Sequence, residues 1–285
     1  MISADPNPNA APAPDSSAVP PAPTFSHGAA IPPIFISHGS PLMMLEAGNA
    51  GIAWQQLAAD LPRPRAILAV SAHWMTRVPA ITAAPQPATI HDFYGFPEAL
   101  YEINYLPPGA SDLVAEIRAL MPEIAVDSKR GLDHGAWVPL RYLYPAADIP
   151  VIQLGVMPDA SPADHFRLGE KLAALTGRGV LIMASGGLTH NLRDLVGDAP
   201  EGRALPYVAE FADWFNDRLA TCDLPALFDY RRQAPHAARA HPSEEHLLPI
   251  FVAMGAGGMK TAPTPVFRHY SAGALALDAF KFNLA

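Results

Sequence analysis

Most of the chain after its first 30 residues consists of short apolar runs separated by amphipathic segments. Four of the runs are continuous and do not alternate with polar positions, which is typical of strands that are covered on both faces. They span residues 31–37, 66–72, 149–156 and 179–185. We therefore expect four buried strands.

The segments between these runs have the spacing of apolar residues that favours helices. The predicted helices span residues 46–60, 111–121, 161–175, 205–219 and 243–256. Alternating strands and helices predict an open, largely parallel sheet with helices on both sides, and residues 265–282 can add antiparallel strands. The expected fold is α/β: one three-layer α/β/α domain, residues 31–285, around a mixed, largely parallel sheet.

Residues 1–30 differ from the rest, because they are nearly all Pro, Ala, Ser, Asn and Asp. So few large apolar side chains do not offset the entropy of ordering a segment, and we expect a flexible tail. The tail lacks the basic start and apolar stretch of a secretory signal, and no segment is long and uncharged enough to cross a bilayer. We expect a cytoplasmic protein without a membrane partner.

Composition narrows the class of ligand. The 285 residues carry a formal net charge of −8 and contain no basic run, so there is no electrostatic footprint for nucleic acid. A small substrate is favoured instead. The chain has one cysteine, Cys222, which excludes an internal disulfide framework and a cysteine-based zinc cluster. A metal site would need histidine and carboxylate ligands.

Histidines follow three of the predicted strands. His38 comes directly after the first run, His73 ends the second, and His190 lies just past the fourth. Ligands of open α/β sheets bind beyond the carboxyl ends of the strands. One such histidine is usually a hydrogen-bonded structural residue, but three at equivalent positions, two of them beside glycines, favour a common site.

A fourth histidine, His246, lies in the segment 241–249. Ser243 is a candidate N-cap for the helix predicted there, and the carboxylates of Glu244 and Glu245 would favourably oppose its dipole. His246 gains nothing from that position, so it is a reasonable fourth ligand. His241, five residues earlier, is an alternative to it.

Two further segments have both a structural and a functional interpretation. His134 lies in 131–137 between glycines, either in a plain turn or as a mobile general acid or base. The segment 91–97 combines aromatic and polar residues, which fits either the edge of a core or a wall that stacks on an aromatic ring. We expect His165 on the surface of the 161–175 helix.

Taken together, six segments resemble those of a known family. HGSP, SAHW, TIHDFYGFPEALY, LDHGAW, ASGGLTHNL and EEHLLP occur in this order and spacing. Between residues 32 and 282 the chain resembles the DOPA-dioxygenase-type branch of the LigB-like, class III extradiol ring-cleavage dioxygenases. The resemblance implies an α/β enzyme with a non-haem metal site that opens the ring of a catechol-type, DOPA-like substrate with O2.

The resemblance also implies roles for particular residues. Metal contacts are implied at His38, His73, His190 and His246, and an acid/base role at His134. The ion would be one divalent metal, Fe(II) for activity, and Zn(II) can occupy such a site. Extradiol enzymes commonly use two histidines and one carboxylate, so either Glu245 or His246 faces the metal.

Two questions stay open at this point. His190 is either a ligand or a second acid/base residue beside His134. A histidine-rich site also suits a zinc-dependent hydrolase, and the scaffold suits a non-catalytic metal-binding or interaction protein. The sequence indicates neither the physiological catechol nor the oligomeric state.

Overall fold

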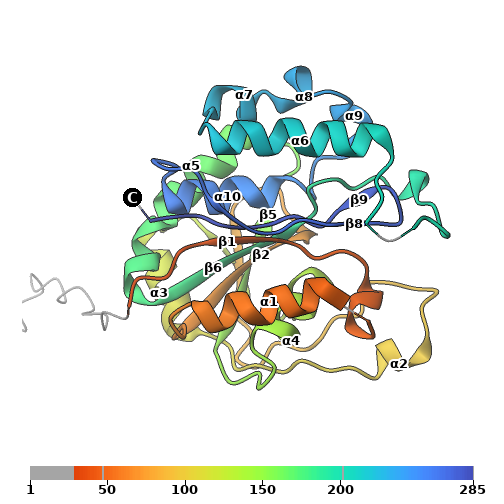
Figure 1. Cartoon of the computed structure of the whole chain (residues 1–285). Coiled ribbons are helices and arrows are strands. Elements are labelled where there is room, and N and C mark those ends of the chain that lie inside the picture. The colour runs from red at the N-terminus through yellow and green to blue at the C-terminus, as the bar shows by residue number, and fades with distance from the viewer. Residues whose placement is uncertain (1–28, 47, 201, 285) are drawn as a thin grey trace, which may run out of the picture.

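The predicted apolar runs lie at the centre of a mixed sheet (Figure 1). The structure, a computed structural model, describes residues 29–46, 48–200 and 202–284. Within these residues the main sheet has eight strands in the order β4-β3-β5-β2-β6-β1-β10-β7. The tail predicted for residues 1–30 lies almost wholly outside the described residues, so that expectation stays a prediction.

All four buried strands are confirmed and pair in parallel as β5-β2-β6-β1. Their bounds are Ile34–Ser37 (β1), Ala66–Met75 (β2), Val151–Val156 (β5) and Val180–Gly186 (β6). The expected antiparallel additions are also present. They are β7 (Thr264–Phe267) and β10 (Ala279–Lys281) in the main sheet, and β8 (Tyr270–Ser271) with β9 (Leu275–Ala276) in a separate ribbon.

Two short strands at the other edge were not predicted. β3 (Ala80–Thr82) pairs antiparallel with β5, and β4 (Ala125–Asp127) pairs parallel with β3. Each has three residues, which is too short for a hydrophobic pattern to show. The mixed, largely parallel sheet of the expected α/β fold is therefore confirmed.

Helices cover both faces of the sheet (Figure 1). One face carries α1 (Gly48–Asp60) and α4 (His134–Leu143), and the other carries α3 (Ser111–Leu120), α5 (Pro162–Leu172) and α10 (Leu248–Gly257). Figure 1 shows α6 (Pro206–Ala220) on the outer side of α10. Short helices connect these elements: η1 (Pro41–Met44), α2 (Glu98–Tyr101), η2 (Ala173–Arg178), η3 (Leu192–Asp194), α7 (Leu224–Phe228), α8 (Tyr230–Gln233) and α9 (Ala237–Ala240).

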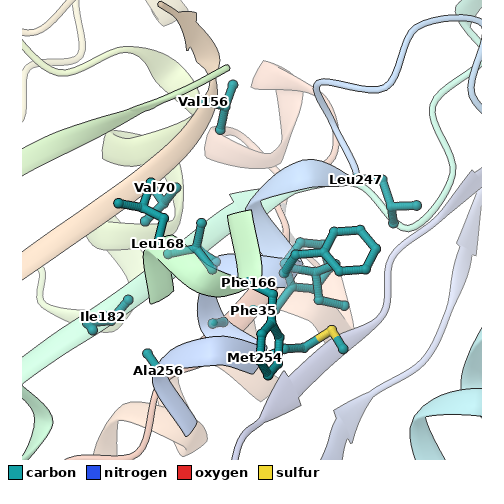
Figure 2. Close-up of a cluster of buried hydrophobic side chains, with 14 of the residues drawn as sticks. Phe35, Val70, Val156, Phe166, Leu168, Ile182, Leu247, Met254 and Ala256 are labelled. Carbon is teal, nitrogen blue, oxygen red and sulfur yellow. The ribbon is translucent and has the colours of Figure 1, made fainter. Parts of the chain in front are cut away.

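The larger core lies between the sheet and the α5 and α10 helices. Figure 2 shows Phe35 of β1 beside Phe166 of α5 and Met254 of α10, and Val70 of β2 near Leu168 of α5. Every residue of α10 is buried, because the helix has neighbours on all sides. A helix that is apolar all round is the expected sequence pattern for such a position.

Three local expectations are wrong. The helix predicted from residue 243 begins at Leu248, since Pro249 favours a first helical turn, and Ser243 is therefore not its N-cap. His165 is fully buried rather than on the surface. Its imidazole accepts the backbone N–H of Met157 at 3.1 Å, and its Nδ1 lies 3.0 Å from the Ser161 carbonyl oxygen.

No helix among the described residues is both long and apolar enough to span a membrane. The expected cytoplasmic location stays a prediction.

Candidate metal centre

Three imidazoles converge at the carboxyl ends of the central strands. His38 follows β1, His73 lies near the end of β2, and His246 lies just before α10. The Nε2 atom of His73 is 3.0 Å from that of His38 and 3.3 Å from that of His246. These nitrogens form one of the groups whose spacing suits a metal ion.

The proton positions on His38 follow from its neighbours. Its Nδ1 lies 2.9 Å from the hydroxyl oxygen of Ser185, and that hydroxyl donates its own proton to the carbonyl of Gly135. Nδ1 of His38 must therefore be the donor to Ser185, which leaves Nε2 with a free lone pair. This Nε2 atom is the one that lies 3.0 Å from Nε2 of His73.

The other two imidazoles have carboxylates on their Nδ1 side. Nδ1 of His246 lies 3.0 Å from Glu245, and Nδ1 of His73 lies 3.6 Å from Asp92. Metal-binding histidines commonly face a carboxylate or carbonyl on the nitrogen that does not bind the ion. Hence all three rings present Nε2 to one point.

The spacing and protonation of the three rings fit a metal ion. Two nitrogens bound about 2.0–2.1 Å from one ion lie roughly 3 Å apart, as the Nε2 atoms do here. Burial lowers the pKa of His38 and His246 well below the ordinary value of 6.5 and lowers that of His73 to about 3. Neutral imidazoles are the form that binds a metal.

The glutamates before His246 point elsewhere. The Oε1 atom of Glu245 contacts Nδ1 of His246 from behind and accepts the Ser243 hydroxyl, so His246 is the residue that meets the other two Nε2 atoms. Glu244 accepts a hydrogen bond from the Tyr230 hydroxyl at 2.6 Å. Both carboxylates thus have side-chain partners, and because α10 begins at Leu248 the expectation that they lie in its first turn and oppose its dipole is wrong.

The fourth predicted ligand, His190, lies beside this group instead of within it. Its ring stacks on that of His246, with centroids 3.3 Å apart and planes 7° apart. An imidazole binds a metal through a lone pair in its own plane, so two stacked parallel rings do not direct their lone pairs to one ion. In this geometry His190 lines the neighbouring cavity, and burial lowers its pKa to about 4.

His134 is the first residue of α4, which the sequence did not predict as a helix. The helix begins there because the carboxylate of Asp133 accepts the backbone N–H of Ala136 at 3.3 Å as an N-cap. Asp133 is fully buried and also receives hydrogen bonds from Ser71 at 2.6 Å and Gln153 at 2.8 Å. This buried network fixes the helix start and hence the position of His134.

Two glycines permit the close approach of the elements around the histidines. A Cβ atom on Gly135 would lie 2.5 Å from the Ser71 hydroxyl and 2.9 Å from the His73 ring. A Cβ atom on Gly186 would lie 2.0 Å from the His246 carbonyl oxygen. Any larger side chain would displace the histidines at these positions.

The 91–97 segment contributes to the site, as one of its two interpretations predicted. Phe93, Tyr94 and Phe96 line a cavity of about 420 Å³ together with His38, His73, His134 and His190. An oxygen of Asp92 lies 3.0 Å from Nδ1 of His134. Asp92 is not among the residues predicted from sequence, although its place beside the aromatic residues is a usable signal.

The remaining candidates lie outside the group. His241, the alternative to His246, is fully buried and its Nε2 donates to the Leu188 carbonyl at 2.8 Å. His236 pairs with Glu210 at 2.9 Å near the surface. Cys222 is a free thiol in the turn between α6 and α7.

The chain is similar over most of its length to known proteins. The family model described as the catalytic LigB subunit of aromatic ring-opening dioxygenase matches residues 32–279. Proteins named 4,5-DOPA dioxygenase extradiol are similar to the chain. The protein of Mirabilis jalapa is 36% identical over 87% of this chain and 96% of its own length, and that of Portulaca grandiflora is 38% identical over 87% of this chain and 94% of its own length. The protein of Escherichia coli is 37% identical over 83% of this chain and 89% of its own length. A crystal structure of an uncharacterized Escherichia coli K12 protein superposes with a TM-score of 0.76 at 31% identity, covering 89% of this chain and all of that one.

Proposed function

Because the chain belongs to the LigB family of aromatic ring-opening dioxygenases and is an extradiol ring-cleaving enzyme of that family, we propose that it opens catechol-type rings with O2 at the His38–His73–His246 centre. The observation that carries the proposal is the convergence of three Nε2 atoms at the end of an aromatic-walled cavity. The substrates would be one aromatic diol and one molecule of O2.

Enzymes of this family use a single metal ion, and we propose Fe(II) as the active one. His38, His73 and His246 would hold it through Nε2, while Ser185, Asp92 and Glu245 keep the Nδ1 sides of these rings in place. A bound ferrous ion supplies Lewis-acid polarisation of the two catechol oxygens and electron exchange with O2. Imidazole ligands suit this ion and leave adjacent positions free.

Two histidines are placed to move protons. His134 and His190 both line the cavity beside the proposed ligands, so each can reach a hydroxyl of a bound catechol. We propose that they accept the phenolic protons and return a proton later in the reaction. The stacking of His190 on His246 supports this role over a fourth ligand position.

The cavity walls would orient the ring. Phe93 packs edge-on against His134, with centroids 5.7 Å apart and planes 85° apart, and it contacts Phe96 in the same way at 5.4 Å. An aromatic substrate gains both apolar contact and ring-edge interactions from such a wall. The neighbouring imidazoles would then face its hydroxyl oxygens.

The test is anaerobic reconstitution of metal-free protein with Fe(II) or Zn(II), followed by addition of O2 and a panel of catechols. We expect consumption of one O2 for each catechol and a coloured ring-opened product with Fe(II) only. Absence of oxygen uptake with every catechol would refute the proposal. Hydrolysis of esters by the zinc-loaded protein under the same conditions would support the hydrolase instead.

A further inference from the structure

The cavity beside the three Nε2 atoms is larger than a catechol ring requires. Its volume is about 420 Å³, whereas a cavity of about 150 Å³ holds benzene. The remaining space can accept a substituent on the ring. The walls of that space therefore bear on which catechol the enzyme takes.

Apart from its imidazoles and Asp92, the cavity is lined by apolar and small side chains. Segments far apart in the sequence contribute large apolar side chains, among them Phe93, Tyr94, Leu192, Leu195, Leu275 and Leu277. Several of them stay accessible from the cavity mouth, since Tyr94 is 92% exposed and Leu192 is 57% exposed. Apolar side chains thus extend from the site to the rim.

Among the described residues that line the cavity, none is a lysine or an arginine. Arg193 follows Leu192 in the chain, but it is exposed and does not line the cavity. The lining carboxylate, Asp92, already lies against His134 at 3.0 Å and His73 at 3.6 Å. Neither the ammonium nor the carboxylate of an amino-acid substituent on the substrate would find a free partner of opposite charge among these lining residues.

The energetic consequence concerns the part of the substrate that points away from the metal. A carboxylate placed against these apolar side chains loses part of its hydration and gains no opposite charge. An alkyl or other neutral group gains free energy from the same contact. We propose that the enzyme prefers a catechol with an uncharged, largely apolar substituent over one with an amino-acid or carboxylate group, an inference that rests on the proposed ring cleavage.

The preference is tested with four catechols that share the ring and differ in its substituent. They are 4-propylcatechol (neutral), dopamine (cationic), 3-(3,4-dihydroxyphenyl)propanoate (anionic) and DOPA (zwitterionic), each with the Fe(II)-loaded full chain. We expect kcat/KM to be at least ten-fold higher for 4-propylcatechol than for the anion and DOPA. Calorimetric titration without O2 should give the same order of Kd values, which places the preference in binding.

A higher kcat/KM for the anion or DOPA than for 4-propylcatechol would overturn the inference while leaving ring cleavage intact. Lack of turnover of all four compounds, with metal content verified, would refute the proposed function instead. The two failures are therefore distinguishable.

A variant with an added cation tests the physical reason. Leu195→Arg places a positive charge on the cavity wall at a residue that is 43% exposed. It should raise kcat/KM for the anionic catechol at least ten-fold relative to 4-propylcatechol. Ile52→Arg is the matched control, because Ile52 lies on α1, is 65% exposed and does not line the cavity. It should change kcat/KM neither for the anionic catechol nor for 4-propylcatechol. Equal effects of the two variants would overturn the inference.

Arg193→Ala tests whether that residue reaches the substrate. The variant should leave kcat/KM for the anionic catechol within about two-fold of the starting protein, since Arg193 does not line the cavity. A selective loss with the anion would show that Arg193 pairs with the carboxylate, and would overturn the inference.

Discussion

The Oδ1 atom of Asp92 lies 3.0 Å from Nδ1 of His134 and accepts the backbone N–H of the same residue at 2.9 Å. One carboxylate therefore contacts both the first backbone N–H of α4, whose start is fixed by Asp133, and the His134 ring. With Nδ1 next to the Asp92 carboxylate, the other ring nitrogen is the one available to exchange protons with a substrate in the cavity. We infer that Asp92 is a positioning residue for His134.

Asp92→Asn should lower kcat by about 10–100-fold, the usual effect of removing a partner behind a catalytic or metal-binding histidine. Iron content at saturating Fe(II), KM for the catechol and the melting temperature should change little. Steady-state kinetics, metal analysis and thermal unfolding measure these quantities. Asp60→Asn, at the end of α1, is the control. A lower melting temperature with unchanged kcat would contradict the positioning role.

Alanine at His38, His73 or His246 should each remove the tightly bound metal, because the three Nε2 atoms lie within 3.0–3.3 Å of their neighbours in one group. Equilibrium dialysis of each variant against Fe(II) under argon measures the loss. His236→Ala, which removes a near-surface histidine paired with Glu210, should bind metal as the starting protein does. Full metal content in any of the three alanine variants would remove that residue from the centre.

His190→Ala separates the two roles of this residue. Since its ring is stacked on that of His246 at 3.3 Å, we expect the variant to keep its metal and to lose at least 100-fold in kcat, the lower range for one proton-transfer group. Metal analysis and oxygen uptake are measured on the same sample. Loss of the metal together with activity would make His190 a fourth ligand.

Gly135→Ala should disturb the centre through steric overlap. The new Cβ would lie 2.5 Å from the Ser71 hydroxyl and 2.9 Å from the His73 ring, so we expect destabilisation of about 1–3 kcal/mol and weaker metal binding. Urea unfolding and metal titration measure the two effects. Gly177→Ala is the matched control, since nothing lies within 4 Å of its Cβ position. Equal stabilities would show that the structure gives way locally at no cost.

The sequence predicted the features that depend on local pattern. Continuous apolar runs located the four parallel strands, and the rule for open sheets placed His38 and His73 at one edge, where the structure has them. The α4 helix was missed because Gly135 and Pro139 both disfavour helices. Its start depends on the buried Asp133 carboxylate, whose partners Ser71 and Gln153 are distant in sequence.

The arrangement within the site was beyond sequence reasoning for the same reason. Asp92 and His134 are 42 positions apart, so their contact depends on the loop path and not on local spacing. Whether Glu245 or His246 faces the centre required the backbone of residues 243–247, which do not form the regular helix that was expected. The stacking of His190 on His246, on which its proposed role rests, is likewise a contact between residues distant in sequence.

The metal-free protein should lose stability as the pH falls from about 6.5 to about 4. Burial lowers the pKa of His241 from the ordinary value of 6.5 to about 4, and the residue is fully buried. Within this window the unfolded chain binds a proton at this residue and the folded chain does not, so the free energy of unfolding rises with pH. At pH 4 the loss from this residue is about 3 kcal/mol.

His241→Gln keeps a donor for the Leu188 carbonyl but does not titrate. Urea unfolding of both proteins at pH 7, 5 and 4 should therefore show a smaller loss in the variant, and parallel losses would show that His241 is already protonated in the fold.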